Sequence, residues 1–136
     1  MRAHVFCFPI VLVAASVFAT PSEAQQGVQW QPTLEGAKRL AAQSNRLVLV
    51  HFWAPWCHAC RRMEQDVFAR GDVAAALEPN YVAVRLNADH FPATARQFGV
   101  TSLPTDVMVT SDGQPVDRIT GALGASQYID KLAQVA

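Results

Sequence analysis

The sequence predicts an α/β fold with a mixed central sheet covered by helices on both faces. Segments with the apolar spacing of helices alternate with short apolar segments typical of strands. Residues 46–54 form a largely unbroken apolar run, which is typical of a strand buried on both faces. The turn sequence at 111–114, Ser-Asp-Gly-Gln, separates two later strand segments and predicts a hairpin. Early strands joined through helices pair in parallel, whereas the late hairpin is antiparallel, so the sheet is expected to be mixed.

Local signals set the order of the elements. Thr33 is expected to cap the first helix, and Gly99 to close a short helix late in the chain. In chain order, the expected elements are an extended lead-in at 25–31, a helix ending at Ser44-Asn45, a strand at 46–54, a helix at 57–69, a short helical piece at 71–77, a strand at 81–87, a helix at 92–98, strands at 105–110 and 115–120, and a last helix at 125–135.

Residues 1–24 are expected to be a cleavable secretory signal. Residues 1–4 are a short basic leader, and residues 5–19 are almost wholly apolar. This run is shorter than the about 20 apolar residues that a membrane-spanning helix needs. Small residues at 22–24 place the expected cleavage before Gln25. The protein is therefore expected in the periplasm or secreted; the alternative is a short membrane anchor.

The composition narrows the class of protein further. The remaining residues, 25–136, suit one domain, expected to be monomeric. Eleven Lys and Arg balance eleven Asp and Glu without a basic run, which argues against a nucleic-acid partner. Of three cysteines, Cys7 lies in the expected signal, and only Cys57 and Cys60 remain. A disulfide that closes so short a loop stabilises a fold little, so this pair is expected to be functional rather than structural.

Cys57 and Cys60 stand where the apolar strand gives way to the expected helix at 57–69. Their spacing separates them by about one helical turn. A cysteine at a helix start lies near unpaired backbone N–H groups and the positive end of the helix dipole, which lowers the pKa of a thiol. Cys57 is therefore expected to be the nucleophile of dithiol–disulfide exchange, and Cys60 the resolving thiol. The alternative is a permanent disulfide or a pair of inert thiols.

Several motifs resemble those of the thioredoxin superfamily, and the resemblance covers nearly all of residues 30–136. The motifs are Phe52-Trp53-Ala54-Pro55-Trp56-Cys57-His58-Ala59-Cys60, Arg85-Leu86-Asn87-Ala88-Asp89, Phe98-Gly99-Val100-Thr101-Ser102-Leu103-Pro104-Thr105 and Gly121-Ala122-Leu123. The resemblance implies a thioredoxin fold and protein-disulfide oxidoreductase activity. Residues 60–64, with Val67, Phe68 and Val73, resemble an exported branch related to the C-terminal domain of the transmembrane reductase DsbD.

The resemblance also assigns substrate-binding residues. Pro104 corresponds to the family's cis-proline, which faces the cysteine pair and leaves backbone groups free to pair with a substrate strand. Leu103 is expected to touch the substrate and tune the redox potential. Trp56 is expected to shield the Cys57 sulfur and offer an apolar rim.

Three further side chains have two interpretations each. His51 stands where many thioredoxins place a buried Asp, and Arg85 where they place its partner lysine, so a nearby Arg85 is expected to favour the neutral imidazole. Neutral His51 is then a proton acceptor for Cys60, or else a hydrogen-bonded core histidine.

Glu64 is an alternative base on the same helix face as Cys60, or a surface partner of an arginine. His58 tunes the Cys57 thiolate when protonated, or is a solvated side chain.

Together these features predict an exported reductant of protein disulfides. Its expected partners are cysteine-containing protein substrates and a membrane thiol reductase that supplies electrons, and no cofactor is expected beyond the Cys57–Cys60 disulfide. The first alternative is a disulfide oxidase or isomerase. A second is a Cu(I) module that uses both cysteines with His58 or His51, although no other metal-ligand cluster accompanies them. A third is a binding domain that uses the groove between Trp56 and Pro104.

Overall fold

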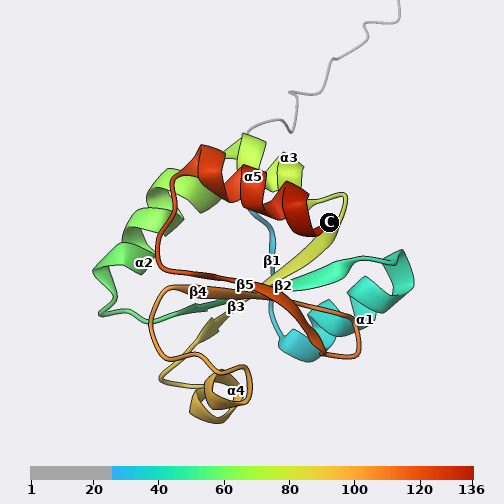
Figure 1. Ribbon diagram of the computed structural model, residues 1–136, viewed down its shortest axis with the longest axis horizontal. Helices are drawn as coiled ribbons and strands as arrows, with labels where there is room; N and C mark the ends of the chain where they lie inside the picture. The colour runs from blue at the N-terminus through green and yellow to red at the C-terminus, as the bar shows by residue number, and fades with distance from the viewer. Residues whose placement is uncertain (1–25) are drawn as a thin grey trace, which may run out of the picture.

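The computed structural model describes residues 26–136, and the expected signal at 1–24 with its cleavage point lies outside this range. The elements along the described chain are β1 (Trp30–Gln31), α1 (Leu34–Ser44), β2 (Leu47–Trp53), α2 (His58–Met63), the π-helical turn η1 (Glu64–Phe68), α3 (Gly71–Leu77), β3 (Tyr81–Asn87), α4 (Pro92–Gln97), β4 (Thr105–Val109), β5 (Pro115–Thr120) and α5 (Ala125–Val135) (Figure 1).

The five strands form one mixed sheet in the order β1-β3-β2-β4-β5. Strand β2 occupies the centre, parallel to β3 and antiparallel to β4, and β5 completes the expected hairpin with β4. Five consecutive residues of β2, from Val48 to Phe52, are buried. The expected mixed sheet, with its central strand buried on both faces, is therefore confirmed.

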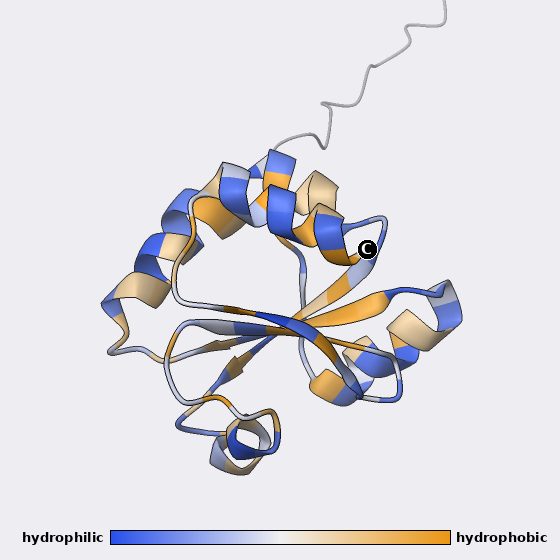
Figure 2. Cartoon of the chain, viewed as in Figure 1, coloured by the Kyte–Doolittle hydropathy of each residue, from blue (hydrophilic) through white to orange (hydrophobic). Residues whose placement is uncertain are grey.

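Helices cover both faces of the sheet (Figure 1). On one face, α2, η1, α3 and α5 enclose a core that includes Leu49, Phe68, Met108 and Tyr128. On the other face, α1 and α4 cover a second core built on alternate positions of the same strands. Hydrophobic residues concentrate in the central strands, while the helices turn polar residues outward (Figure 2). The alternation along β2 thus supplies both cores.

Local capping explains where several elements begin and end. The Thr33 side chain accepts a hydrogen bond from the backbone N–H of Gly36, as expected of an N-cap. Asn45 ends α1 in the left-handed conformation, which Asn adopts more readily than most residues. The last helix, α5, has the bounds that the sequence predicts.

Two elements differ from the sequence prediction. The lead-in includes a strand, β1, that pairs in parallel with β3 and was not predicted. The helix expected at 57–69 changes after Met63 into the π-helical turn η1, in which Ala69 N–H donates to the Glu64 carbonyl oxygen. The wider turn brings the adjacent residues Val67 and Phe68 into the core together. None of the helices within residues 26–136 is long and apolar enough to cross a membrane.

The lead-in approaches η1 so closely that only glycine fits at position 27. A Cβ atom added to Gly27 would lie 2.4 Å from the backbone oxygen of Phe68. Because that contact is with backbone, Gly27→Ala forces the chain apart and is expected to destabilise the protein by about 1–3 kcal/mol. Urea denaturation of the two proteins measures this difference.

Gly124 offers the matched control. Its added Cβ would have no neighbour nearer than 3.9 Å, and it stands at the N-cap of α5 with a φ of −74°. Because serine is favoured at N-caps, Gly124→Ser is expected to leave stability unchanged or raise it slightly. Equal stability of Gly27→Ala and the wild type would contradict the close approach.

Candidate active site

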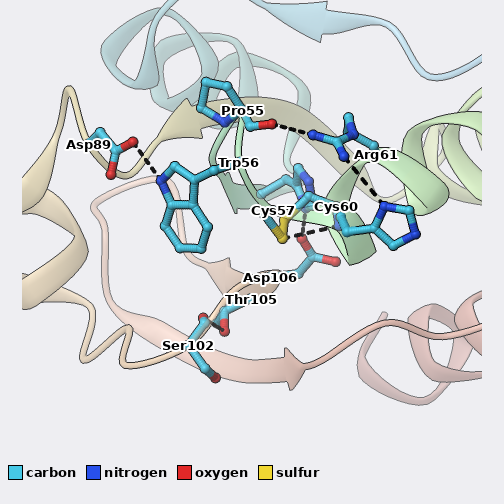
Figure 3. Close-up of a disulfide and its surroundings, with 11 residues drawn as sticks. Pro55, Trp56, Cys57, Cys60, Arg61, Asp89, Ser102, Thr105 and Asp106 are labelled. Carbon is cyan, nitrogen blue, oxygen red and sulfur yellow. Dashed lines mark hydrogen bonds and ion pairs between the residues drawn. A yellow bond between two sulfur atoms is a disulfide. The ribbon is translucent and has the colours of Figure 1, made fainter.

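Cys57 and Cys60 form a disulfide at the point where β2 leads into α2, with their Cα atoms 5.3 Å apart (Figure 3). Strand β2 ends at Trp53, and Cys57 is the N-cap residue of α2. Cys57 is 6% exposed and Cys60 3% exposed, in a cluster with Ala54. Both described cysteines therefore lie at the start of a helix that closely follows the central strand.

The Cys57 sulfur occupies the position of a capping acceptor. The backbone N–H of Cys60 donates to Cys57 Sγ over 3.1 Å. A thiolate formed there on reduction keeps this donor and meets the positive end of the helix dipole. This geometry fits the assignment of Cys57 as nucleophile and of Cys60, deeper in the helix, as resolving thiol.

An apolar rim and a turn flank the disulfide. Trp56 is 67% exposed, and its Nε1–H donates to Asp89 Oδ2 over 2.9 Å. The Leu103–Pro104 peptide bond is cis, as the resemblance implies. Leu103 is half-buried against the cysteine cluster, whereas Pro104 is buried. The structure therefore brings Leu103 to the cysteines and holds the Trp56 ring in the open; their roles in binding substrate stay predictions.

His58, between the cysteines, lies beside a permanent cation. Arg61 donates from one guanidinium nitrogen to the Pro55 carbonyl oxygen over 2.7 Å, and its Nη2 lies 3.4 Å from His58 Nδ1. In this contact the imidazole nitrogen is the acceptor, because a guanidinium only donates.

His51 has a different neighbour from the one expected. Its side chain is 1% exposed, and its Nδ1 lies 2.5 Å from Asp106 Oδ1 on β4. Arg85 is its register partner on β3, but the Arg85 side chain is 43% exposed. The expectation that Arg85 is the charged neighbour of His51 is therefore wrong, since the side chain bonded to His51 is the Asp106 carboxylate.

Arg85 and Glu64 pair with each other at the surface. Arg85 Nη1 donates to Glu64 Oε1 over 2.6 Å, and both side chains are nearly half exposed. The guanidinium also lies over the rings of Trp30 and Trp53, at 5.8 and 5.9 Å from their centroids. Glu64 therefore occupies the surface ion pair that the alternative interpretation describes, and its role as a base stays a prediction.

Sequence reasoning missed Asp106 and Tyr128. Asp106 Oδ2 accepts a hydrogen bond from the Tyr128 hydroxyl over 2.8 Å, and both residues are buried. Burial raises the pKa of the Tyr128 phenol well above its usual range, and the Asp106 carboxylate raises it further. The sequence signal for this contact is the acidic residue Asp106 inside the apolar strand at 105–110, because a buried carboxylate requires a hydrogen-bond partner.

The fold and the cysteine pair together define a class of protein. A disulfide at a helix start, beside an exposed aromatic ring and a cis-proline turn, serves thiol–disulfide exchange through a mixed disulfide. Within residues 26–136, no group of three or more His, Cys, Asp or Glu side chains is arranged to hold a metal ion. The arrangement is that of a thiol–disulfide oxidoreductase.

Comparison with known proteins identifies the family. A family model for the thioredoxin-like domain matches residues 34–136, so the chain belongs to this family. The thioredoxin of Mycobacterium tuberculosis (strain ATCC 25618 / H37Rv) is 38% identical over 92 residues, which are 68% of this chain and 76% of that protein. A thioredoxin from Thermus thermophilus has a TM-score of 0.71 at 28% identity, covering 81% of this chain and 88% of that one. The oxidised DsbD C-terminal domain of Neisseria meningitidis, 20% identical, shares the fold, with a TM-score of 0.63 and coverage of 74% and 90%.

The site predicts unequal reactivity of the two reduced thiols. Cys57 is expected to react with iodoacetamide faster than Cys60, because only Cys57 holds the capping position that stabilises a thiolate. Mass spectrometry of the alkylated, digested protein measures the two rates. Cys57→Ser should remove the fast reaction and Cys60→Ser should keep it, whereas equally slow thiols would contradict the assignment.

The Glu64–Arg85 pair predicts a small effect of Glu64→Gln. Because the pair is exposed, the substitution is expected to change stability by less than about 1 kcal/mol and to leave the exchange rate unchanged. Insulin reduction and thermal unfolding measure the two quantities. A selective slowing of the step in which Cys60 attacks the mixed disulfide would instead assign Glu64 the role of base.

Proposed function

We propose that this oxidoreductase is an exported reductant of protein disulfides. In this proposal Cys57 attacks a substrate disulfide, and Cys60 releases the reduced substrate. The electrons pass from the dithiol to the substrate, which leaves the Cys57–Cys60 disulfide behind. The cysteine pair then serves as the redox centre without a further cofactor.

The observation that carries the direction of electron flow is the similarity of the chain to thioredoxins. The identity to thioredoxins exceeds one third of the aligned residues, and thioredoxin is among the more reducing members of this class. The resemblance of residues 60–64 to the exported branch related to DsbD supports a link with a reductase outside the cytoplasm. In the proposal, a membrane thiol reductase returns electrons to Cys57–Cys60.

The proposal of export rests on residues 1–24. Their basic start, apolar run and small residues before Gln25 are the pattern of a secretory signal. N-terminal sequencing of the protein from its native cells checks this directly. A mature chain that starts at Gln25 supports export, and an intact Met1 in the cytoplasmic fraction contradicts it.

The reduction potential tests the direction. Equilibration with glutathione mixtures is expected to give a value near that of thioredoxin, about −270 mV, because the chain is similar to thioredoxins. A value near that of DsbA, about −120 mV, would contradict the proposal and indicate an oxidase. His58→Ala separates the two interpretations of His58: an unchanged potential indicates a solvated side chain, and a more negative potential indicates that the imidazole tunes the Cys57 thiolate.

A further inference from the structure

A buried polar cluster joins three elements on the face of the sheet that α2 covers. It consists of His51 on β2, Asp106 on β4 and Tyr128 on α5. Asp106 uses both carboxylate oxygens, Oδ1 with His51 Nδ1 at 2.5 Å and Oδ2 with the Tyr128 hydroxyl at 2.8 Å. All three side chains are at most 2% exposed.

The cluster lies close to the disulfide. His51 and Trp53 are two residues apart on β2, so their side chains leave the same face, and Trp53 packs against the cluster that contains Cys60. The His51 ring also meets the Phe68 ring of η1, with centroids 4.7 Å apart, and η1 continues the helix that holds Cys60.

Stability alone is a poor explanation for this cluster. Burying ionisable groups carries a desolvation cost, and apolar residues of similar volume often serve a core equally well. Buried ionisable groups beside a reactive centre are instead typical of proton transfer. The high pKa of the Tyr128 phenol keeps it a hydrogen-bond donor, so it presents a proton to Asp106 rather than a second charge.

We propose that Asp106 is a positioning residue that holds His51 as the proton acceptor of Cys60, while Tyr128 fixes the second oxygen of Asp106. A carboxylate only accepts hydrogen bonds, so the His51–Asp106 contact places the imidazole proton on Nδ1. Nε2 then carries the free lone pair. The inference rests on the exchange chemistry of Cys57 and Cys60 and is independent of its physiological direction.

The proposed exchange transfers two electrons to the substrate and one proton through His51. The Cys57 thiolate attacks a substrate disulfide, and one substrate thiolate leaves. In the mixed disulfide, the Cys60 thiol passes its proton to His51 Nε2, and the resulting imidazolium is stabilised by the Asp106 carboxylate. The Cys60 thiolate attacks Cys57 Sγ and expels the second substrate thiolate. Two electrons have moved to the substrate, and the proton on His51 returns to solvent.

Other charged or titratable groups around His51 are already engaged. From β3, Arg85 is bonded to Glu64 of η1 at the surface. From α5, Tyr128 is bonded to Asp106, and the nearby Tyr81 hydroxyl donates to the Leu132 carbonyl oxygen. From α2, the cysteine pair packs with Trp53, the residue two positions after His51 on β2. Asp106 is therefore the carboxylate bonded to the imidazole.

A two-step optical assay tests the proposal. When the dithiol protein is mixed with excess 5,5′-dithiobis(2-nitrobenzoate), Cys57 releases the first thionitrobenzoate and Cys60 releases the second. Asp106→Asn is expected to slow the second release about 100-fold, because the Asn amide donates to Nδ1 and moves the imidazole proton to Nε2. The first release should stay unchanged. Tyr128→Phe should slow the second release less.

Asp117→Asn is the matched control, since Asp117 lies on β5 and pairs with Lys131 at the surface. It should leave both releases unchanged. A folded Asp106→Asn protein whose second release equals that of the wild type would overturn the proposal. Slowing of both releases alike would also overturn it, because a general structural defect does not single out Cys60.

Nitrogen NMR of the wild-type dithiol protein supplies a test that needs no variant. The neutral His51 ring is expected to carry its proton on Nδ1, with Nε2 unprotonated. A neutral ring that carries its proton on Nε2 would overturn the proposal. Neither experiment depends on the reduction potential or on export, so both remain decisive if the protein proves to be an oxidase.

Discussion

The placement of β2 between β3 and β4 is the constraint on which the rest of the structure depends. Because β2 is hydrogen-bonded on both edges and covered on both faces, its end is a fixed point. The disulfide follows four residues after that end, at the start of α2. The antiparallel pairing of β4 brings Thr105 opposite Phe52, and with it the cis-Pro104 turn toward the cysteines. A rigid central strand thus holds the nucleophile and the turn in one place.

The register of β2 with β4 separates an exposed rim from a buried polar pair. The rim, with Trp56 and the Arg61–His58 contact, is exposed, so its charges are screened by solvent. The interior pairs His51 with Asp106, and both side chains are buried. The proposed substrate contact thus falls to the exposed rim, and the proposed proton transfer falls to the buried pair.

The sequence predicts what local signals determine. The caps, the apolar run of β2 and the turn of the β4–β5 hairpin set most of the fold, and the spacing of Cys57 and Cys60 sets the reactive pair. Strand β1 is two residues long and exists through its pairing with β3, which no local pattern records. The His51–Asp106 contact depends on an antiparallel register across 55 residues of chain, which the local sequence does not record. Arg85 instead pairs at the surface with Glu64, the first residue of the unpredicted turn η1.

The redox state of Cys57 and Cys60 in living cells tests most directly whether the protein donates electrons to disulfides, as we propose. Acid quenching followed by alkylation with a mass-tagged maleimide fixes the thiol state before it changes. A reductant supplied with electrons by a membrane partner should be found mainly as the dithiol, with both cysteines tagged. A population found mainly as the disulfide in growing cells would contradict the account and indicate an oxidase.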